Sequence, residues 1–475
     1  MVDLSLFPRG DPDRSERTYI APSSTWLAPS RVIASPHWQY TTGKIFLGAI
    51  GDTMLGVRDD RHLITIAGSR AGKGVSAIVP NLLLYPGSVL CIDPKGENAA
   101  ITARQRAALG QTVYTLDPFG TSGLPIASFN PLSIIDMSKE TCVDDAALIA
   151  DGMIMQEESG AGRHFTASAR NWIRGLILYV AAHEPPERRN LMRVRELMTL
   201  SGADLSSLLD DMIASTAGYG VIARAARAMD QKDEKEFSGV LSTAIEQTDF
   251  LDSPAMAKVL ARSDFALRDL KRGKISVFLC LPAGRMATHN RWLRIIINLV
   301  IESMERDSPP PDDHPVLVIM DEFPILGHME SVEKAAGLIA GYGVRLWPII
   351  QDLSQLKRHY KESWETFLGN AGLLQAFGNS DLTTLKYLSE RLGQAMITNV
   401  SQGEISQSQA ASGFRGTSFS QSFTPLLTAE EVGRFFSRQM GAQILLWSGS
   451  NPIAAERVEY YRHPMFAGKF QPRGA

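Results

Sequence analysis

A short apolar run, a glycine-rich turn and a lysine follow one another at HLITIAGSRAGKGVS, residues His62 to Ser76. Gly68 and Gly72 permit a tight backbone turn, which points successive N–H groups and the start of the next helix at one place. Such a turn binds phosphate, and Lys73 would add a mobile positive charge for the β- and γ-phosphates. The predicted nucleotide-binding loop comprises Gly68, Ser69, Arg70, Ala71, Gly72, Lys73, Gly74 and Val75.

This loop departs twice from the usual pattern G-x-x-x-x-G-K-[ST]. Ala67 stands at the first glycine, and Gly74 stands where a hydroxyl group normally binds Mg²⁺. Ser76 is a poor substitute, because two helix positions turn its side chain to the far side of the helix. Taken alone, the turn fits a plain strand-to-helix connection as well as a nucleotide site.

A second apolar run, PVLVIMDEF (Pro315 to Phe323), ends in two acids. Carboxylates at the carboxyl edge of a parallel sheet face the ligand crevice, which favours a catalytic interpretation. Asp321 would hold Mg²⁺, directly or through water, and Glu322 would polarise the attacking water. The alternative is that both acids cap the helix that follows. The glycine-rich loop upstream makes a hydrolytic nucleotide site the stronger hypothesis.

A third apolar run, Val344 to Ile350, ends at Gln351. Its amide is a candidate to sense the γ-phosphate or to orient the attacking water, as a glutamine does in small GTPases. Pro348 lies inside this run and is awkward for a central strand, because proline has no N–H to donate to a neighbouring strand.

The remaining pattern predicts an α/β fold with helices on both faces of a sheet, because short apolar runs alternate with helical stretches. The length of 475 residues and an apolar content of 44% suffice for two or three domains. The predicted strands are 63–67, 88–93, 112–116, 275–281, 316–320, 344–350, 373–377 and 443–447.

Strand-like runs are lacking between about residues 136 and 262, where Ala-, Leu-, Met- and Arg-rich segments dominate. We therefore predict an all-α domain inserted into the nucleotide-binding fold. The expected organisation is an N-terminal surface arm (1–60), the first part of the nucleotide-binding domain (61–135), the all-α insertion (136–262) and the second part (263–475). A Ser/Gln/Gly tract at 401–422 is expected to be a mobile loop or hairpin.

Composition favours a cytoplasmic protein. Cys91, Cys142 and Cys280 share no metal-ligand spacing, and no run approaches the roughly 20 apolar residues that span a bilayer. The net charge of −3 gives no general sign of nucleic-acid binding, so DNA contacts would have to be local. The basic runs 266–274 and 356–361 are candidates, although such runs are usually solvated faces.

Several blocks in order resemble the motifs of type IV secretion coupling proteins, the TraG-like conjugative DNA transfer ATPases. The resemblance covers roughly residues 50–465, and Gly74 after the lysine is a normal variant in that family. The matching blocks are AGSRAGKGVSAIVPNLL, VLCIDPKGEN (89–98), TLDPFG (115–120), SFNPL (128–132), MDEFPILG (320–327), IIQDLSQL (349–356), LGN (368–370) and PLLTAEEV (425–432).

The resemblance implies a RecA-like P-loop NTPase domain that uses ATP and Mg²⁺, with an all-α domain that helps to choose the cargo. It also implies a hexameric ring with nucleotide clamped between subunits. Single-stranded DNA, often with an attached relaxase, or effector proteins would pass toward components of a type IV secretion channel.

Two features depart from this family pattern. Family members usually begin with transmembrane helices, and none is recognisable here, so we expect a cytoplasmic chain that is recruited to the inner membrane by a partner, acts away from it, or is a trimmed form. The arginine finger is expected between the Asp-Glu pair and Gln351, where the chain has only Lys334 and Arg345. Arg345 is the candidate catalytic arginine, with a surface salt-bridge partner as the alternative.

Two other functions stay open on the sequence. One is a HerA- or FtsK-like DNA motor outside secretion, and the other is a nucleotide-regulated adaptor with little turnover. We expect the isolated chain to be largely monomeric and to form rings with single-stranded DNA and ATP. We also expect Lys73→Ala to abolish nucleotide binding or turnover while leaving the fold intact, because the crevice should be exposed.

Overall fold

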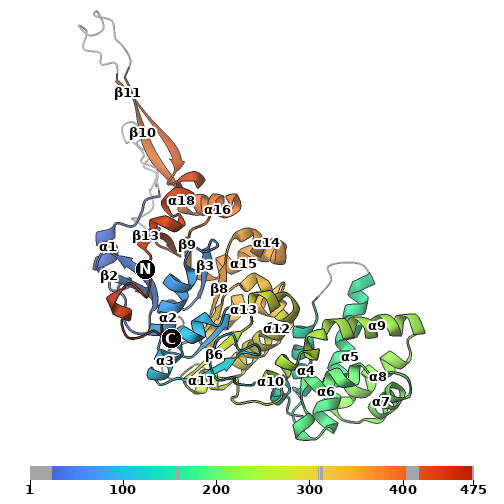
Figure 1. Cartoon of the computed structure of the whole chain (residues 1–475). Helices are drawn as coiled ribbons and strands as arrows, with labels where there is room; N and C mark the ends of the chain where they lie inside the picture. Colours follow the sequence, from blue (N-terminus) through green and yellow to red (C-terminus); the bar gives the residue numbers. More distant parts are fainter. Residues whose placement is uncertain (1–23, 156–160, 309, 311–313, 403–416, 473–475) are drawn as a thin grey trace, which may run out of the picture.

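The computed structural model describes residues 24–155, 161–308, 310, 314–402 and 417–472. An 11-stranded sheet runs through the larger part of the molecule (Figure 1). Its parallel strands are β3 (His62–Ala67), β4 (Val89–Asp93), β5 (Thr112–Leu116), β6 (Ile275–Cys280), β7 (Val316–Met320), β8 (Val344–Ile350) and β9 (Ala371–Phe377). All of these strands except β5 are buried along nearly their whole length, which explains their largely apolar sequences.

Antiparallel strands extend the sheet beyond β9. They are β12 (Ala442–Trp447), β13 (Ile453–Glu456), β1 (Ile45–Ile50) and β2 (Thr53–Val57). The strand order is β2-β1-β13-β12-β9-β3-β8-β7-β4-β6-β5. All eight strands predicted from the sequence are present, with ends that differ by at most two residues.

Residues 45–57 differ from the surface arm that we expected over residues 1–60. They form β1 and β2, and Phe46, Leu47, Leu55 and Val57 are each 1% exposed or less. Glycines interrupt both runs and obscured the strand pattern. Gly48 is required at its position, because a Cβ there would lie 2.1 Å from the Glu456 carbonyl oxygen.

Pro348 lies in a central strand after all, between β3 and β7. β8 pairs with β3 only beyond Pro348, at Ile349 and Ile350. Upstream, the Leu346 N–H donates to Nδ1 of buried His62 over 3.1 Å, and Trp347 Nε1 donates to the Thr65 hydroxyl over 2.8 Å. Side chains of β3 therefore replace the main-chain pairing that the proline prevents.

Helices cover the sheet. Those of the body are α1 (Pro29–Ala34), α2 (Val79–Leu84), α3 (Glu97–Ala108), α11 (Asp269–Arg272), α12 (Ala283–Arg306), α13 (Glu330–Leu338), α14 (Leu353–Tyr360), α15 (Trp364–Gly369), α16 (Leu382–Leu392) and α18 (Ala429–Phe435). In the part of the chain that the structure describes, no helix is both long and apolar enough to cross a membrane.

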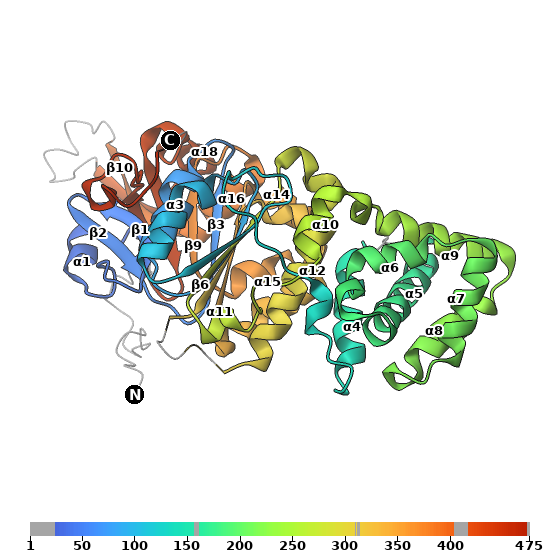
Figure 2. The ribbon, with the colours of Figure 1, turned by 60° about the horizontal axis from the view of Figure 1, so that its bottom comes forward.

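A group of helices lies beside the body, as Figure 2 shows. It consists of α4 (Cys142–Met153), α5 (Ala161–His183), α6 (Leu191–Met198), α7 (Gly202–Ala214), α8 (Val221–Asp230), α9 (Glu234–Gln247) and α10 (Pro254–Leu260). The chain enters this group after β5 and returns to the sheet at β6. The predicted fold class, an α/β domain with an inserted all-α unit, is confirmed.

A two-stranded ribbon projects from the body next to α16 and α18 (Figure 1). It pairs β10 (Gln394–Gln402) with β11 (Thr417–Pro425), from Gln394 opposite Pro425 to Gln402 opposite Thr417. The ends of the predicted tract 401–422 thus belong to a hairpin, and residues 403–416 lie outside the described part of the chain.

Candidate nucleotide site

The glycine-rich loop joins β3 to a π-helical turn, η2 (Gly74–Ile78), and then to α2. Gly72 adopts a φ of +95°, a conformation that side chains other than hydrogen disfavour. Gly68 is required for a different reason, because a Cβ there would lie 1.9 Å from the carbonyl oxygen of Gly378. The loop therefore packs directly against the end of β9, at the carboxyl edge of the parallel strands.

Lys73, Asp321, Glu322 and Gln351 come together at this edge. Lys73 Nζ lies 3.0 Å from Asp321 Oδ1 and also pairs with Glu322 Oε1. Gln351 Nε2 donates to both carboxylate oxygens of Glu322, over 3.1 and 3.0 Å. Three strands, β3, β7 and β8, thus place one cation, two acids and one amide in contact, as expected for side chains that follow neighbouring parallel strands.

Burial governs the charges of this cluster. Burial raises the pKa of Asp321, and the Lys73 ammonium group opposes that rise. For Lys73, burial alone would lower the pKa, but the two carboxylates outweigh it and the pKa is raised. The lysine is therefore held as a cation, and its charge compensates the charges of the two acids.

Asp321 fits the predicted role in holding Mg²⁺, although the usual hydroxyl partner is lacking. Ser76 is 3% exposed, and its hydroxyl group donates to the Gly72 carbonyl oxygen over 2.8 Å. It therefore points back into the helix, as its position in the sequence suggested. Mg²⁺ commonly takes one or two carboxylates and keeps several waters, so one carboxylate with water and phosphate oxygens fits the ion.

Arg345 lies at the beginning of β8, at the opposite edge of the sheet from Gln351. Its guanidinium group donates to the main-chain oxygens of Asp59, Ala340 and Val344, over 3.0, 2.8 and 3.0 Å. Lys334, the other cation of this interval, pairs with Glu330 over 2.7 Å. The structure therefore does not bring Arg345 to the Lys73 cluster of its own chain, and a role in a neighbouring subunit stays a prediction.

Arg457 contacts the glycine-rich loop and was missed in the sequence. Its guanidinium group donates to the carbonyl oxygens of Ala71 and of Arg438, the latter over 2.7 Å, and lies 4.9 Å from the centre of the Phe377 ring. It follows β13, which is only four residues long. No motif surrounds it, so this contact could not be predicted from the sequence.

Asn379 was also missed, although a signal existed. It is the second residue after β9, is 6% exposed, and donates to the Gln351 carbonyl oxygen over 3.1 Å. Its Oδ1 is buried and has no hydrogen-bond partner among the described residues. Because a polar residue just beyond the end of a buried parallel strand lies at the ligand edge, Asn379 is a further candidate for the site.

Asp93 braces a helix next to the site. It is 1% exposed, its Oδ2 accepts from the Ala99 N–H over 2.8 Å at the start of α3, and burial raises its pKa to about 7. In the basic run 266–274, buried Lys271 donates to the carbonyl oxygens of Met304 and Asp307. These contacts favour structural roles for both residues over contact with nucleotide or DNA.

A family model described as type IV secretory system conjugative DNA transfer matches residues 22–473. The chain belongs to this family. Protein VirD4 of Rhizobium radiobacter is 28% identical over 436 residues, which cover 90% of this chain and 60% of that protein. Conjugal transfer protein TraG of Escherichia coli is 28% identical over 445 residues, which cover 86% of this chain and 68% of TraG. The chain thus spans 60% of the length of this VirD4 relative.

Solved structures of the coupling protein TrwB share the fold. TrwBdeltaN70 superimposes with a TM-score of 0.67 at 13% identity, covering 95% of this chain and 97% of that chain. TrwB was also solved in complex with the ATP analogue ADPNP, with a TM-score of 0.67, and with ADP and Mg²⁺, with a TM-score of 0.65. The predicted family and the RecA-like fold with a helical insertion are confirmed.

Proposed function

We propose that this chain is an ATP-dependent coupling protein. It would move single-stranded DNA, with an attached relaxase, or effector proteins toward a type IV secretion channel. The observation that carries the proposal is the pairing of Lys73 with Asp321 and Glu322, and of Glu322 with Gln351, beside the glycine-rich loop. Membership of the conjugative DNA transfer family supports the cargo and the channel as partners.

Each residue of the candidate site would have a separate role in ATP hydrolysis. The main-chain N–H groups of loop 68–75 bind phosphate oxygens, and Lys73 turns from the carboxylates to the β- and γ-phosphates. Asp321 would hold Mg²⁺, directly or through water, and the bound ion would supply positive charge beside the phosphates. Loss of the Lys73 contact frees the Glu322 carboxylate to take a proton from water, while the Gln351 amide keeps Glu322 oriented. Hydrolysis thus begins only after phosphate has drawn Lys73 away.

Assembly would complete the site. A hexameric ring places each nucleotide between two subunits, and an arginine from the neighbour, for which Arg345 is the candidate, would stabilise the charge of the transition state. A ring also repeats each local basic group around one channel, which suits a protein with a net charge of only −3. We place the protein in the cytoplasm, reaching the inner membrane through a partner.

One observation favours a second function, a nucleotide-regulated adaptor with little turnover. Gly74 has no hydroxyl group, and that of Ser76 is committed to the Gly72 carbonyl oxygen. With its metal ion incompletely held, the protein would bind nucleotide but hydrolyse it slowly. Binding of ADPNP without measurable turnover, with or without DNA, is the result that would establish the adaptor.

The test is ATP hydrolysis with and without single-stranded DNA. We expect DNA to stimulate the native chain, and Glu322→Gln to lower kcat by about 100-fold or more while keeping ADPNP bound, because an amide cannot accept the proton. Asp321→Ala should chiefly weaken Mg²⁺-dependent binding. Glu362→Gln, at an exposed position in the same domain, is the matched control. If Glu322→Gln and Asp321→Ala lose nucleotide affinity equally, Glu322 is not the base.

A further inference from the structure

Glu322 has an unusual backbone conformation for a catalytic candidate. Its φ is +54°, in the left-handed region, and Gly327 five residues later has a φ of +66°. For a residue other than glycine this conformation is strained. Such strain persists only where the surrounding structure holds it in place. The contacts that hold the segment from Glu322 to His328 therefore decide where the carboxylate points.

Two side chains of α12 hold this segment through its carbonyl oxygens. Asn290 Nδ2 donates to Ile325 over 3.0 Å, and Arg294 Nη1 donates to Leu326 and His328 over 2.6 and 2.8 Å. The two residues stand one helical turn apart, on one face, and are 5% and 6% exposed. We name Asn290 and Arg294 the α12 clamp.

The clamp also holds the all-α insertion. Arg294 Nε donates to the Gly152 carbonyl oxygen over 3.3 Å, and Nη2 donates to that of Ile154 over 3.4 Å, at the end of α4. Burial lowers the pKa of Arg294 to about 10, which leaves the group cationic at neutral pH. One buried guanidinium group thus depends on main-chain oxygens from both units, and a shift of either unit changes its contacts with the other.

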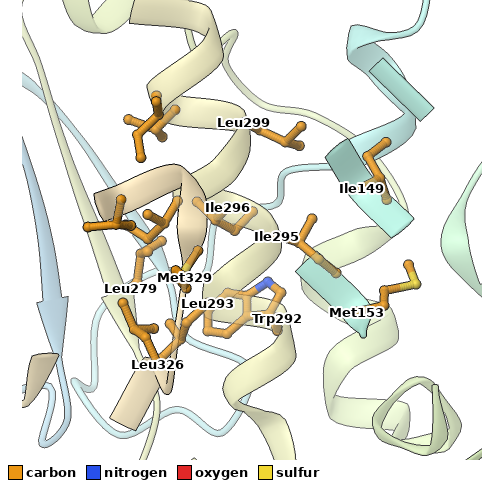
Figure 3. Close-up of a cluster of buried hydrophobic side chains, with 14 of the residues drawn as sticks. Ile149, Met153, Leu279, Trp292, Leu293, Ile295, Ile296, Leu299, Leu326 and Met329 are labelled. Carbon is orange, nitrogen blue, oxygen red and sulfur yellow. The ribbon is translucent and has the colours of Figure 1, made fainter. Parts of the chain in front are cut away.

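Apolar packing couples the same elements. Figure 3 shows Ile295 of α12 against Ile149 and Met153 of α4, and Leu293 next to Leu326. The contact with α4 is tight, because a Cβ at Gly152 would lie 2.7 Å from the Ile295 Cα. Close packing transmits strain, so a displacement of α4 would reach α12.

A cavity of about 570 Å³ adjoins the clamp. Asp151 and Arg170 of the insertion line it on one side, and Arg294, His328 and Lys334 of the body line it on the other. Space beside the clamp allows the insertion to change its packing against the body without opening the apolar core.

We propose that Asn290 and Arg294 are positioning residues that aim Glu322 and make its position respond to the all-α insertion. The inference rests on the ATPase activity proposed above. Cargo bound to the insertion would then change the rate of hydrolysis at a site that it does not touch. Because energetic coupling is reciprocal, nucleotide bound at the loop must also change the end of α4.

Hydrogen exchange of the full chain, with and without ADPNP and Mg²⁺, tests this coupling. In the native chain we expect slower exchange at 68–76, at 325–330 and at 150–155. Arg294→Lys keeps the charge but loses the fork of donors, and Asn290→Ala removes one contact. Both variants should keep the protection at 68–76 and lose the change at 150–155, with kcat lowered at least tenfold and KM within about twofold.

Arg285→Lys is the matched control, because Arg285 is an exposed arginine of the same helix. If Arg294→Lys does not fold, Asn290→Ala decides alone. The inference is overturned if native protection at 68–76 comes with no change at 150–155, or if the folded variants keep both the distal change and the native kcat. Native protein without protection at 68–76 would overturn the nucleotide site itself, and the inference with it.

Discussion

Replacing Lys73 by methionine removes the cation between two acids. The side chains of Lys73, Asp321 and Glu322 are only 17%, 13% and 29% exposed. The sequence led us to expect that a change of this lysine would leave the fold intact, on the assumption of an exposed crevice. Breaking a buried ion pair by removing one partner costs 3–5 kcal/mol, because the other charge stays buried. Since the crevice keeps some solvent contact, we expect a loss of about 3 kcal/mol in unfolding free energy at pH 8.

The size of this loss depends on pH. Burial already raises the pKa of Asp321, and Lys73 opposes the rise, so its removal raises the pKa further. A carboxyl group with a folded-state pKa above its unfolded value binds more protons when folded. Its contribution to stability is fully present below the unfolded pKa and is lost as pH rises through the folded pKa. The difference between native and Lys73→Met protein should therefore be smaller at pH 5 than at pH 8.

Urea unfolding followed by tryptophan fluorescence at both pH values measures this difference. The double variant Lys73→Met/Asp321→Asn should recover most of the loss, because no uncompensated acid stays buried at position 321. Both variants should fail to bind ADPNP. Lys95→Met, at an exposed lysine of the same domain, is the control. Native stability of Lys73→Met at pH 8, or no recovery in the double variant, would refute the reasoning.

Two further predictions concern pH and assembly. Burial lowers the pKa of His62 from 6.5 to about 4, so the unfolded chain binds more protons between these values, and stability should fall by roughly 3 kcal/mol as pH drops through that window. His62→Asn keeps an acceptor near the Leu346 N–H, and its free energy of unfolding, measured in urea titrations, should depend less on pH. The same pH dependence as in the native protein would contradict this prediction. If Arg345 completes the site of a neighbouring subunit, specific ATPase activity should rise with protein concentration and with oligomers seen by light scattering. A strict monomer with flat activity, unchanged by DNA, would reject the ring and favour the adaptor.

Continuous apolar runs identified the central strands because parallel strands are buried on both faces. The antiparallel additions gave weaker patterns. Gly48 and Gly56 interrupt β1 and β2, and the Ser- and Gln-rich β10 and β11 form a ribbon of their own, outside the large sheet. Pairing between distant segments of the chain, such as Ala49 with Glu456, is not encoded in either segment alone. The sequence therefore predicted the interior of the sheet better than its edges.

The same distinction holds for the candidate site. Lys73, Asp321, Glu322 and Gln351 were predictable because Asp321, Glu322 and Gln351 come at the ends of apolar strands and Lys73 closes the glycine-rich loop after another, at the carboxyl edge of the sheet. Arg294 and Arg457 act on main-chain oxygens of segments distant in sequence, and such contacts leave no motif. The residues of the candidate site were thus accessible to sequence reasoning, and the residues that hold the loops in position required the structure.

The charges of the resting cluster indicate how nucleotide binding would start. One lysine stands against two carboxylates, so the pocket as a whole favours cations over a bare triphosphate. A nucleotide that arrives with Mg²⁺ has part of its negative charge already neutralised by the ion. Its phosphates would then draw Lys73 away from Glu322. Glu322 then keeps the Gln351 amide and the strained backbone that the α12 clamp holds. The direction of its carboxylate at that moment depends on α12, and hence on the packing of the all-α insertion against the body.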